Sequence, residues 1–109
     1  MPVDGSYERR LAQLEADLDR LVRRLGSLTS HGWRPREAAV RVLAQNLADL
    51  AATAEGRALR PVPALPVYGL ADVVAVLGGD VLISLSGRET TDLLDATAEL
   101  VDAALRNTV

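Results

Sequence analysis

The chain has 109 residues, no cysteine, one histidine and a formal net charge of −3. This length suits a single domain over 1–109. Without cysteine the chain can form no disulfide, iron–sulfur cluster or cysteine zinc site, and one histidine excludes a multi-histidine metal centre within one chain. Every basic residue is arginine, which excludes Schiff-base lysine chemistry and a P-loop.

Hydropathy and the N-terminal residues set the expected class of protein. Apolar residues make up 49% of the chain, which is typical of a folded domain. The N-terminal residues carry charges of both signs where a signal peptide needs an apolar segment. We expect no segment apolar enough to span a membrane, and hence a cytoplasmic protein without a membrane partner. The composition, rich in arginine and alanine and free of lysine, is typical of a GC-rich bacterial genome.

Charge is divided unevenly along the chain. Residues 1–60 hold ten arginines and eight acids, a net charge of +2, whereas residues 61–109 hold two arginines and seven acids, a net charge of −5. The two halves therefore complement each other in charge. A nucleic-acid partner would require a basic balance across the domain, so we expect no nucleic acid.

Residues 7–28 form an apolar ladder with the alternating 4-3 spacing of a heptad repeat. Its members are Tyr7, Leu11, Leu14, Leu18, Leu21, Leu25 and Leu28. This spacing predicts a helix over 7–28 that packs along other helices. In a parallel dimer Arg10 would face Glu15 of the partner, while Val22 widens the stripe and favours a bundle. The candidate interface residues are Tyr7, Leu11, Leu14 and Leu18, with Arg10 and Glu15.

A second helix is predicted over 35–55, after a break at Gly26–Trp33. Pro35 suits its first turn, and Gly56 is a common stop signal after a last turn. Apolar residues recur along this segment at helical spacing, at Val40, Leu43, Leu47, Leu50 and Ala54. Because the connection is short, we expect the first two helices to be antiparallel neighbours.

Residues 57–68 contain three prolines, which predict an extended strap in place of a helix. A dozen extended residues reach roughly 30–36 Å, enough to cross a helix bundle from end to end. We expect the apolar side chains of the strap, Leu59, Val62, Leu65 and Val67, to pack on the helices.

The segment 70–85 allows two interpretations. As a helix, it buries one apolar face, and its two glycines, Gly78 and Gly79, would mark a close approach of two helix backbones or a kink. As a hairpin at 73–85, Val73–Leu77 and Val81–Leu85 would form strands around a Gly-Gly-Asp turn. The helix is favoured, because neither arm alternates and an isolated hairpin is only marginally stable.

A last helix is predicted over 87–106, because Ser86 and Glu89 fit a capping box, with Thr90 and Thr91 as alternative caps. Together these segments predict an all-α fold, a four-helix bundle with a Pro-rich crossover strap over 57–68. The alternative is an α+β fold with a hairpin at 73–85.

One cluster of residues could bind an anion. His31 and Trp33 lie in the break, and arginines flank them near the start of the second helix, whose dipole also attracts anions. The candidate ligand-binding residues are Arg24, His31, Trp33, Arg34 and Arg36. The plainer interpretation is that Trp33 closes one end of the bundle, with solvated arginines around it.

Catalytic signals are scarce. Ser86 lacks the Gly-x-Ser-x-Gly context of a nucleophile elbow, and the sequence has no Glu-x-x-His pair for a di-iron site. No motif ties the chain to a known family, and we expect no enzyme, no cofactor and no metal site. The residues indicate a non-catalytic interaction module that forms a homodimer or binds another helical protein. The alternative is a small-molecule or anion-binding protein that uses the end around His31 and Trp33.

Overall fold

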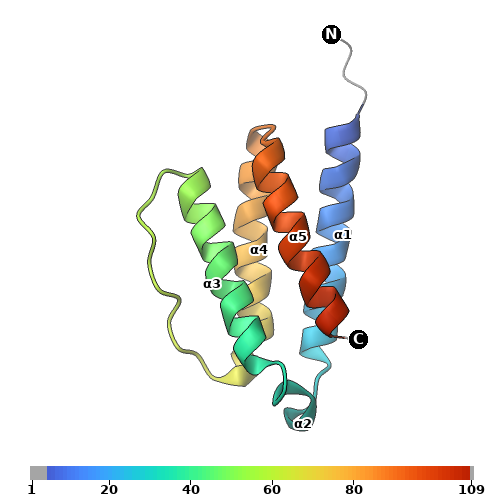
Figure 1. Cartoon of the computed structure of the whole chain (residues 1–109), viewed down its shortest axis with the longest axis vertical. Coiled ribbons are helices and arrows are strands. Elements are labelled where there is room, and N and C mark those ends of the chain that lie inside the picture. Colours follow the sequence, from blue (N-terminus) through green and yellow to red (C-terminus); the bar gives the residue numbers. More distant parts are fainter. Residues whose placement is uncertain (1–4, 109) are drawn as a thin grey trace.

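The computed structural model describes residues 5–108, and this part of the chain is all-helical (Figure 1). Its long helices are α1 (Ser6–Gly26), α3 (Glu37–Ala54), α4 (Leu70–Gly87) and α5 (Thr91–Asn107). A one-turn helix, α2 (Ser30–Trp33), precedes α3, and a 3-10 turn, η1 (Val67–Gly69), precedes α4. The predicted all-α class is confirmed. The alternative hairpin at 73–85 is wrong, because this segment forms the middle of α4 and buries its apolar residues at helical spacing.

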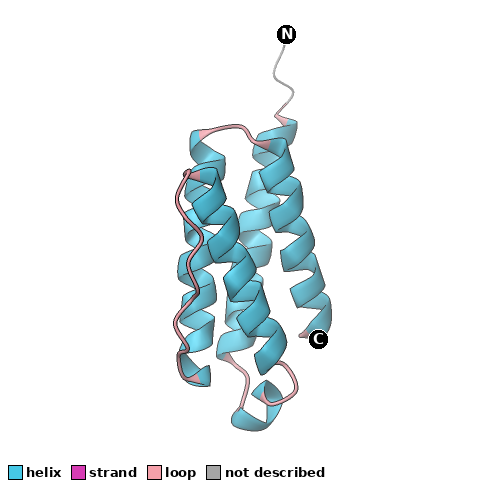
Figure 2. Ribbon diagram, turned by 60° about the vertical axis from the view of Figure 1, so that its left-hand side comes forward, coloured by secondary structure: helices cyan, strands magenta, loops and turns pink. Residues whose placement is uncertain are grey.

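The path of the chain explains how the long helices pair. In Figure 1, α1 runs down, α3 runs up, the strap returns to the lower end, α4 runs up and α5 runs down. Figure 2 shows the strap along one side of the helices. Consequently α3 and α4 are parallel to each other, and so are α1 and α5.

Helices α1 and α3 both pack against α4 and α5, and they share few contacts with each other. We expected α1 and α3 to be antiparallel neighbours. They are antiparallel, as expected, but the expectation that they pack against each other is wrong. The physical reason is the link over 27–36, which contains α2. It is longer than the two to about five residues of a helical hairpin, so it carries the chain across the end of the molecule.

The start of the last helix also differs from the prediction. Helix α4 continues through Ser86 to Gly87, and α5 begins at Thr91. The capping box from Ser86 to Glu89 does not form, because Ser86 remains in the last turn of α4. The hydrogen bond from the Arg88 N–H to the Ser84 carbonyl (3.2 Å) closes this last turn around Ser86.

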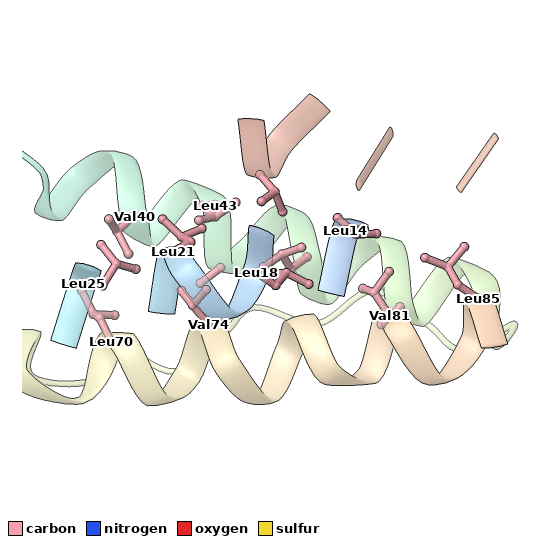
Figure 3. Packing of buried hydrophobic residues seen from close by; sticks show 14 of the residues in the cluster. Leu14, Leu18, Leu21, Leu25, Val40, Leu43, Leu70, Val74, Val81 and Leu85 are labelled. Atoms are coloured by element: carbon pink, nitrogen blue, oxygen red, sulfur yellow. The ribbon is translucent and has the colours of Figure 1, made fainter. Parts of the chain in front are cut away.

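The leucine ladder of α1 faces the core of the chain. Figure 3 shows its side chains pointing into the space between α3 and α4. The buried apolar residues of the long helices include Leu14, Leu18, Leu21 and Leu25 of α1, Val40, Leu43 and Leu47 of α3, Leu70, Val74, Val81 and Leu85 of α4, and Leu94 and Val101 of α5. Thr97 is also fully buried, and its hydroxyl donates to the Leu93 carbonyl (2.7 Å). The heptad pattern thus contributes to an intramolecular core.

Helix α4 approaches α1 closely at Gly78. A Cβ atom at this position would lie 2.9 Å from Leu18 Cδ2, closer than real Cβ contacts, whereas a Cβ at Gly79 would meet nothing within 4 Å. The close approach predicted for the two glycines is therefore present at Gly78, where a leucine side chain fills the space left by the missing Cβ, and is absent at Gly79 within this chain.

This difference between neighbouring glycines can be measured. At protein concentrations low enough for the single chain, Gly79→Ala should raise the free energy of unfolding by about 0.5–1 kcal/mol, because alanine suits a helix better than glycine. Gly78→Ala should show no gain or a loss of about 1 kcal/mol, because the methyl group crowds buried Leu18. Urea unfolding followed by circular dichroism tests both variants, and an equal gain at both positions would contradict the packing described here.

Candidate functional site

The predicted anion site lies at the lower end of the molecule, where α1 ends and α3 begins (Figure 1). Trp33 of α2 is only 6% exposed and belongs to the apolar core. The Thr29 side chain caps α2 by accepting from the Gly32 N–H (3.2 Å). The tryptophan therefore closes this end of the core and does not offer an open stacking surface.

Two of the predicted anion ligands donate to the C-terminal end of α5. Arg24 Nη1 donates to the Leu105 carbonyl (3.3 Å). Arg36 Nε donates to the Asn107 carbonyl (3.2 Å), and its Nη1 donates to the Gly32 carbonyl (2.7 Å). The last carbonyls of a helix lack partners within the helix and carry partial negative charge. The two guanidinium groups therefore cap α5 and already have acceptors within the protein.

The structure does not gather all five predicted ligand residues around one pocket. A groove between α3 and α5 at this end is lined by Arg36 and by none of the other four. The side chains of His31 and Arg34 are exposed. Anion binding at this end remains a prediction.

The capping role of Arg36 predicts a stability effect. Arg36→Met keeps the apolar stem but removes the donors, so it should lower the free energy of unfolding by about 1 kcal/mol. Amide hydrogen exchange in the last turn of α5 should accelerate in the same variant. Arg34→Met is the matched control, since Arg34 is exposed, and it should change neither quantity. Equal behaviour of the two variants would argue against the cap.

Tyr7 joins α1 to the link between α4 and α5 at the opposite end. Its hydroxyl donates to the Leu85 carbonyl (2.8 Å), with the Arg88 carbonyl as a second acceptor at 3.1 Å. The same oxygen accepts from the Thr90 N–H (3.1 Å). A residue predicted as an interface position thus holds the backbone between two helices of its own chain.

Removal of this hydroxyl should destabilise the protein. Tyr7→Phe leaves the part-buried backbone groups of the link without their partner, which should lower the free energy of unfolding by about 1–2 kcal/mol. The measurement is urea unfolding, together with hydrogen exchange at the Thr90 amide. Tyr68→Phe serves as the control because Tyr68 is 84% exposed, and it should leave stability unchanged. A silent Tyr7→Phe variant would show that water replaces the hydroxyl without loss.

The other predicted interface residues are also drawn into contacts within the chain. Arg10 forms an ion pair with Asp95 of α5. Leu14 and Leu18 are buried in the core, and Leu11 packs against it. A parallel dimer that pairs Arg10 with a partner's Glu15 would have to break this ion pair. Glu15 itself is exposed on α1.

The strap is attached to α3 by the amide group of Gln45. The Oε1 atom accepts from the Val62 N–H (2.8 Å), and Nε2 donates to the Arg60 carbonyl (3.0 Å) and to Asp49 Oδ1 (2.9 Å). One primary amide has one acceptor oxygen and two donor hydrogens, and all of them are used. This anchor could not be predicted from residue pattern, because Gln45 lies on the polar side of an amphipathic helix.

The apolar side chains of the strap behave differently from one another. Leu59 and Leu65 are exposed, so the expectation that they pack on the helices is wrong. Val67 does pack against the core, and Val62 is half-buried. The backbone contact with Gln45 explains the difference, because it fixes the strap without requiring all its side chains to turn inward.

The strap begins with a well-formed helix stop. Gly56 has a positive φ of 69°, a conformation that favours glycine. The Arg57 N–H donates to the Ala52 carbonyl (2.8 Å) and the Gly56 N–H to the Thr53 carbonyl (3.2 Å), which is the Schellman pattern. A hydrogen bond from Arg57 to Glu55, and the attraction between their charges, raise the pKa of Arg57.

The outer side of α4 carries exposed apolar side chains beside two grooves. We define the α4 outer face by Ala75, Val76, Gly79, Leu82 and Ile83. A groove of about 490 Å³ between α1 and α4 is lined in part by Ala75, Gly79 and Leu82. Beside it, Val76 is 64% and Ile83 is 72% exposed. A second groove, of about 430 Å³, lies between α4 and the strap and also includes Val76.

The apolar character of this helix exceeds what was expected from the sequence. By length and composition alone, Val67–Gly87 could cross a membrane, with a mean hydropathy of 1.7. The expectation that no segment is apolar enough is therefore wrong on this criterion. A core helix of a soluble protein passes the same test, but only 33% of the segment is buried. Core packing accounts for most of the apolar composition, because Ala71, Val73, Leu77 and Leu82 also pack partly buried against the core. The exposed Ala75, Val76 and Ile83 account for the rest.

Within residues 5–108, no group of three or more His, Asp or Glu side chains is placed to hold a metal ion. In the same range, every buried side-chain nitrogen and oxygen has a hydrogen-bond partner. Comparisons with protein-family models, with curated proteins and with solved structures gave no match. A functional assignment for this chain therefore depends on its own surfaces.

Proposed function

We propose that this protein is a non-catalytic interaction module, a four-helix bundle that associates with a second copy of itself through the α4 outer face. The observation that supports the proposal is the exposure of Val76 and Ile83, at 64% and 72%, on a helix whose apolar residues otherwise form the core. Single exposed apolar side chains are ordinary on protein surfaces. Here they lie at helical spacing on one face, beside a groove whose α4 wall is apolar and whose α1 wall includes Glu15 and Asp19. Clustered exposed apolar side chains beside a groove are the pattern of a docking surface.

Gly79 adds to the support for this face. Glycine in a helix costs about 1 kcal/mol relative to alanine, and no contact within the chain requires its missing Cβ, since a Cβ there would meet nothing within 4 Å. Gly78, in contrast, makes room for Leu18. A glycine on the outer face lets a second helix come close at the centre of the patch.

The spacing of the patch is self-complementary. Val76 and Ile83 lie at equal sequence distances on either side of the Gly79–Asp80 pair. In an antiparallel pairing of two α4 helices about a two-fold axis at that pair, Val76 of each copy faces Ile83 of the other. Such an isologous contact is the commonest way in which two identical chains associate.

Charged substitutions on the face test the proposal. Ile83→Glu and Val76→Glu should each weaken the dimer at least about tenfold, because a desolvated carboxylate without a partner opposes association. The matched control is Val42→Glu on α3, where the wild-type valine is also 59% exposed. Size-exclusion chromatography with light scattering, run across micromolar concentrations, measures the change.

The expected result is a dimer for the wild-type chain and the control, and a monomer for the two α4 variants. A wild-type chain that stays monomeric at every concentration would refute self-association. If Val42→Glu weakens the dimer equally, the contact does not lie on the α4 outer face, or the added negative charge alone explains the loss.

A further inference from the structure

The core of this molecule lies between two halves of the chain and hardly within either. We call residues 5–56, with α1 to α3, the first half, and residues 57–108, with the strap, α4 and α5, the second half. Helices α1 and α3 pack on α4 and α5, whereas α1 shares few contacts with α3 and α4 shares few with α5. Figure 1 shows α1 and α3 on opposite sides of the molecule. In each half, the two long helices are held apart from each other, and the helices of the other half pack between them.

The polar contacts follow the same division. The ion pair of Arg10 with Asp95, the hydrogen bonds of Tyr7 with the link after α4, and the caps that Arg24 and Arg36 place on α5 all join the first half to the second. The first half holds eight arginines and seven acids, a net charge of +1, and the second half holds four arginines and seven acids, a net charge of −3, which favours the same association. Each half therefore carries a surface that fits the other half in shape, apolar area and charge.

The strap that joins the halves has little slack. Helix α3 has 18 residues, which corresponds to about 27 Å at 1.5 Å per residue. Strap residues 57–66 reach about 31 Å at 3.1 Å per residue, and they must cover the length of α3 to return to the lower end. Prolines at 61, 63 and 66 keep this segment extended. The strap is thus a stiff, nearly taut connection between two complementary halves.

We propose that two copies of this chain exchange their second halves, so that the first half of each copy packs with α4 and α5 of the other. The partner is a second copy of the same chain, and the inference rests on the proposed self-association, for which it supplies the arrangement of the chains. Every helix contact of the single chain is kept in the exchanged dimer. The change is confined to the strap and to its contact with Gln45.

The exchanged arrangement also suits the α4 outer face. When the two cores lie side by side and antiparallel, the upper end of each α3 is near the lower end of the other core, where the exchanged α4 begins. Each strap then has to cross only the short distance between the two cores. The same antiparallel arrangement brings Val76 of each α4 next to Ile83 of the other. One geometry therefore accounts for both the strap and the exposed face.

A cross-linking experiment on the full-length chain tests the exchange. The chain has no cysteine, so the double variant Arg10→Cys with Asp95→Cys places one thiol in each half, at side chains that are in direct contact. A short bismaleimide is added to the dimer fraction, and the products are separated on a denaturing gel. Asp17→Cys with Arg20→Cys, both within α1, is the control and should give single-chain products throughout.

The expected result is that most of the cross-linked product contains two chains, because the reactive thiols of one core come from different copies. Single-chain product from a particle that light scattering shows to be a dimer would overturn the exchange and leave the α4 contact standing. Single-chain product from a strictly monomeric chain would overturn both the exchange and the proposed self-association.

A shortened strap provides a second, independent test. Deletion of residues 58–61 leaves about six strap residues, which reach roughly 19 Å and cannot follow α3 back to its start. The exchanged dimer should then be the single folded species, with wild-type helix content by circular dichroism and two-chain products from the same thiol pair. A folded monomer would overturn the proposal. An unfolded chain would overturn it as well, because an exchanged antiparallel dimer does not need a long strap.

Discussion

The packing of α4 against both α1 and α3 is the constraint on which the rest of the structure depends. Those two helices share few contacts, so α4, together with α5, holds them in one molecule. The fit requires Gly78, which admits the side chain of Leu18, and the full burial of Val74, Val81 and Leu85. A helix that serves two neighbours must be apolar over a wide arc, and the arc of α4 extends further, onto its outer face.

Local patterns in the sequence predicted much of the fold. The 4-3 ladder identified Leu14 and Leu18 as positions that pack against helices, and the three prolines identified the strap. The pairing of the helices could not be predicted in the same way, because it depends on the route of the link over 27–36 across the end of the molecule. The capping box at Ser86 was wrong for a related reason. A capping motif describes a helix start only if the preceding helix has already ended, and here α4 extends through it.

The contacts at the candidate site could not be predicted from local sequence, because each joins segments that are far apart in the chain. The sequence placed Arg24 and Arg36 near one another, but their acceptors are carbonyls at the far end of the chain. The hydroxyl of Tyr7 and the amide of Gln45 were likewise invisible as anchors, since each binds backbone groups of a distant segment. Residue type and spacing thus identified side chains able to form hydrogen bonds, but their partners depend on the fold. Most residues predicted as a dimer interface belong to the core of the single chain: Leu14 and Leu18 are buried, and Tyr7 and Leu11 pack against them.

The division of the core between two halves has a consequence for how the chain folds. Helix α1 packs on α4 and α5, which lie far along the chain, and not on its successor α3, so folding should be slower than in a chain built from successive helical hairpins. Synthesis from the N-terminus sharpens the effect. The leucines of α1 leave the ribosome well before Leu70 and the rest of α4 exist to cover them. For that interval the nascent chain carries an uncovered apolar ladder, which is the kind of segment that chaperones bind and that other nascent chains can trap.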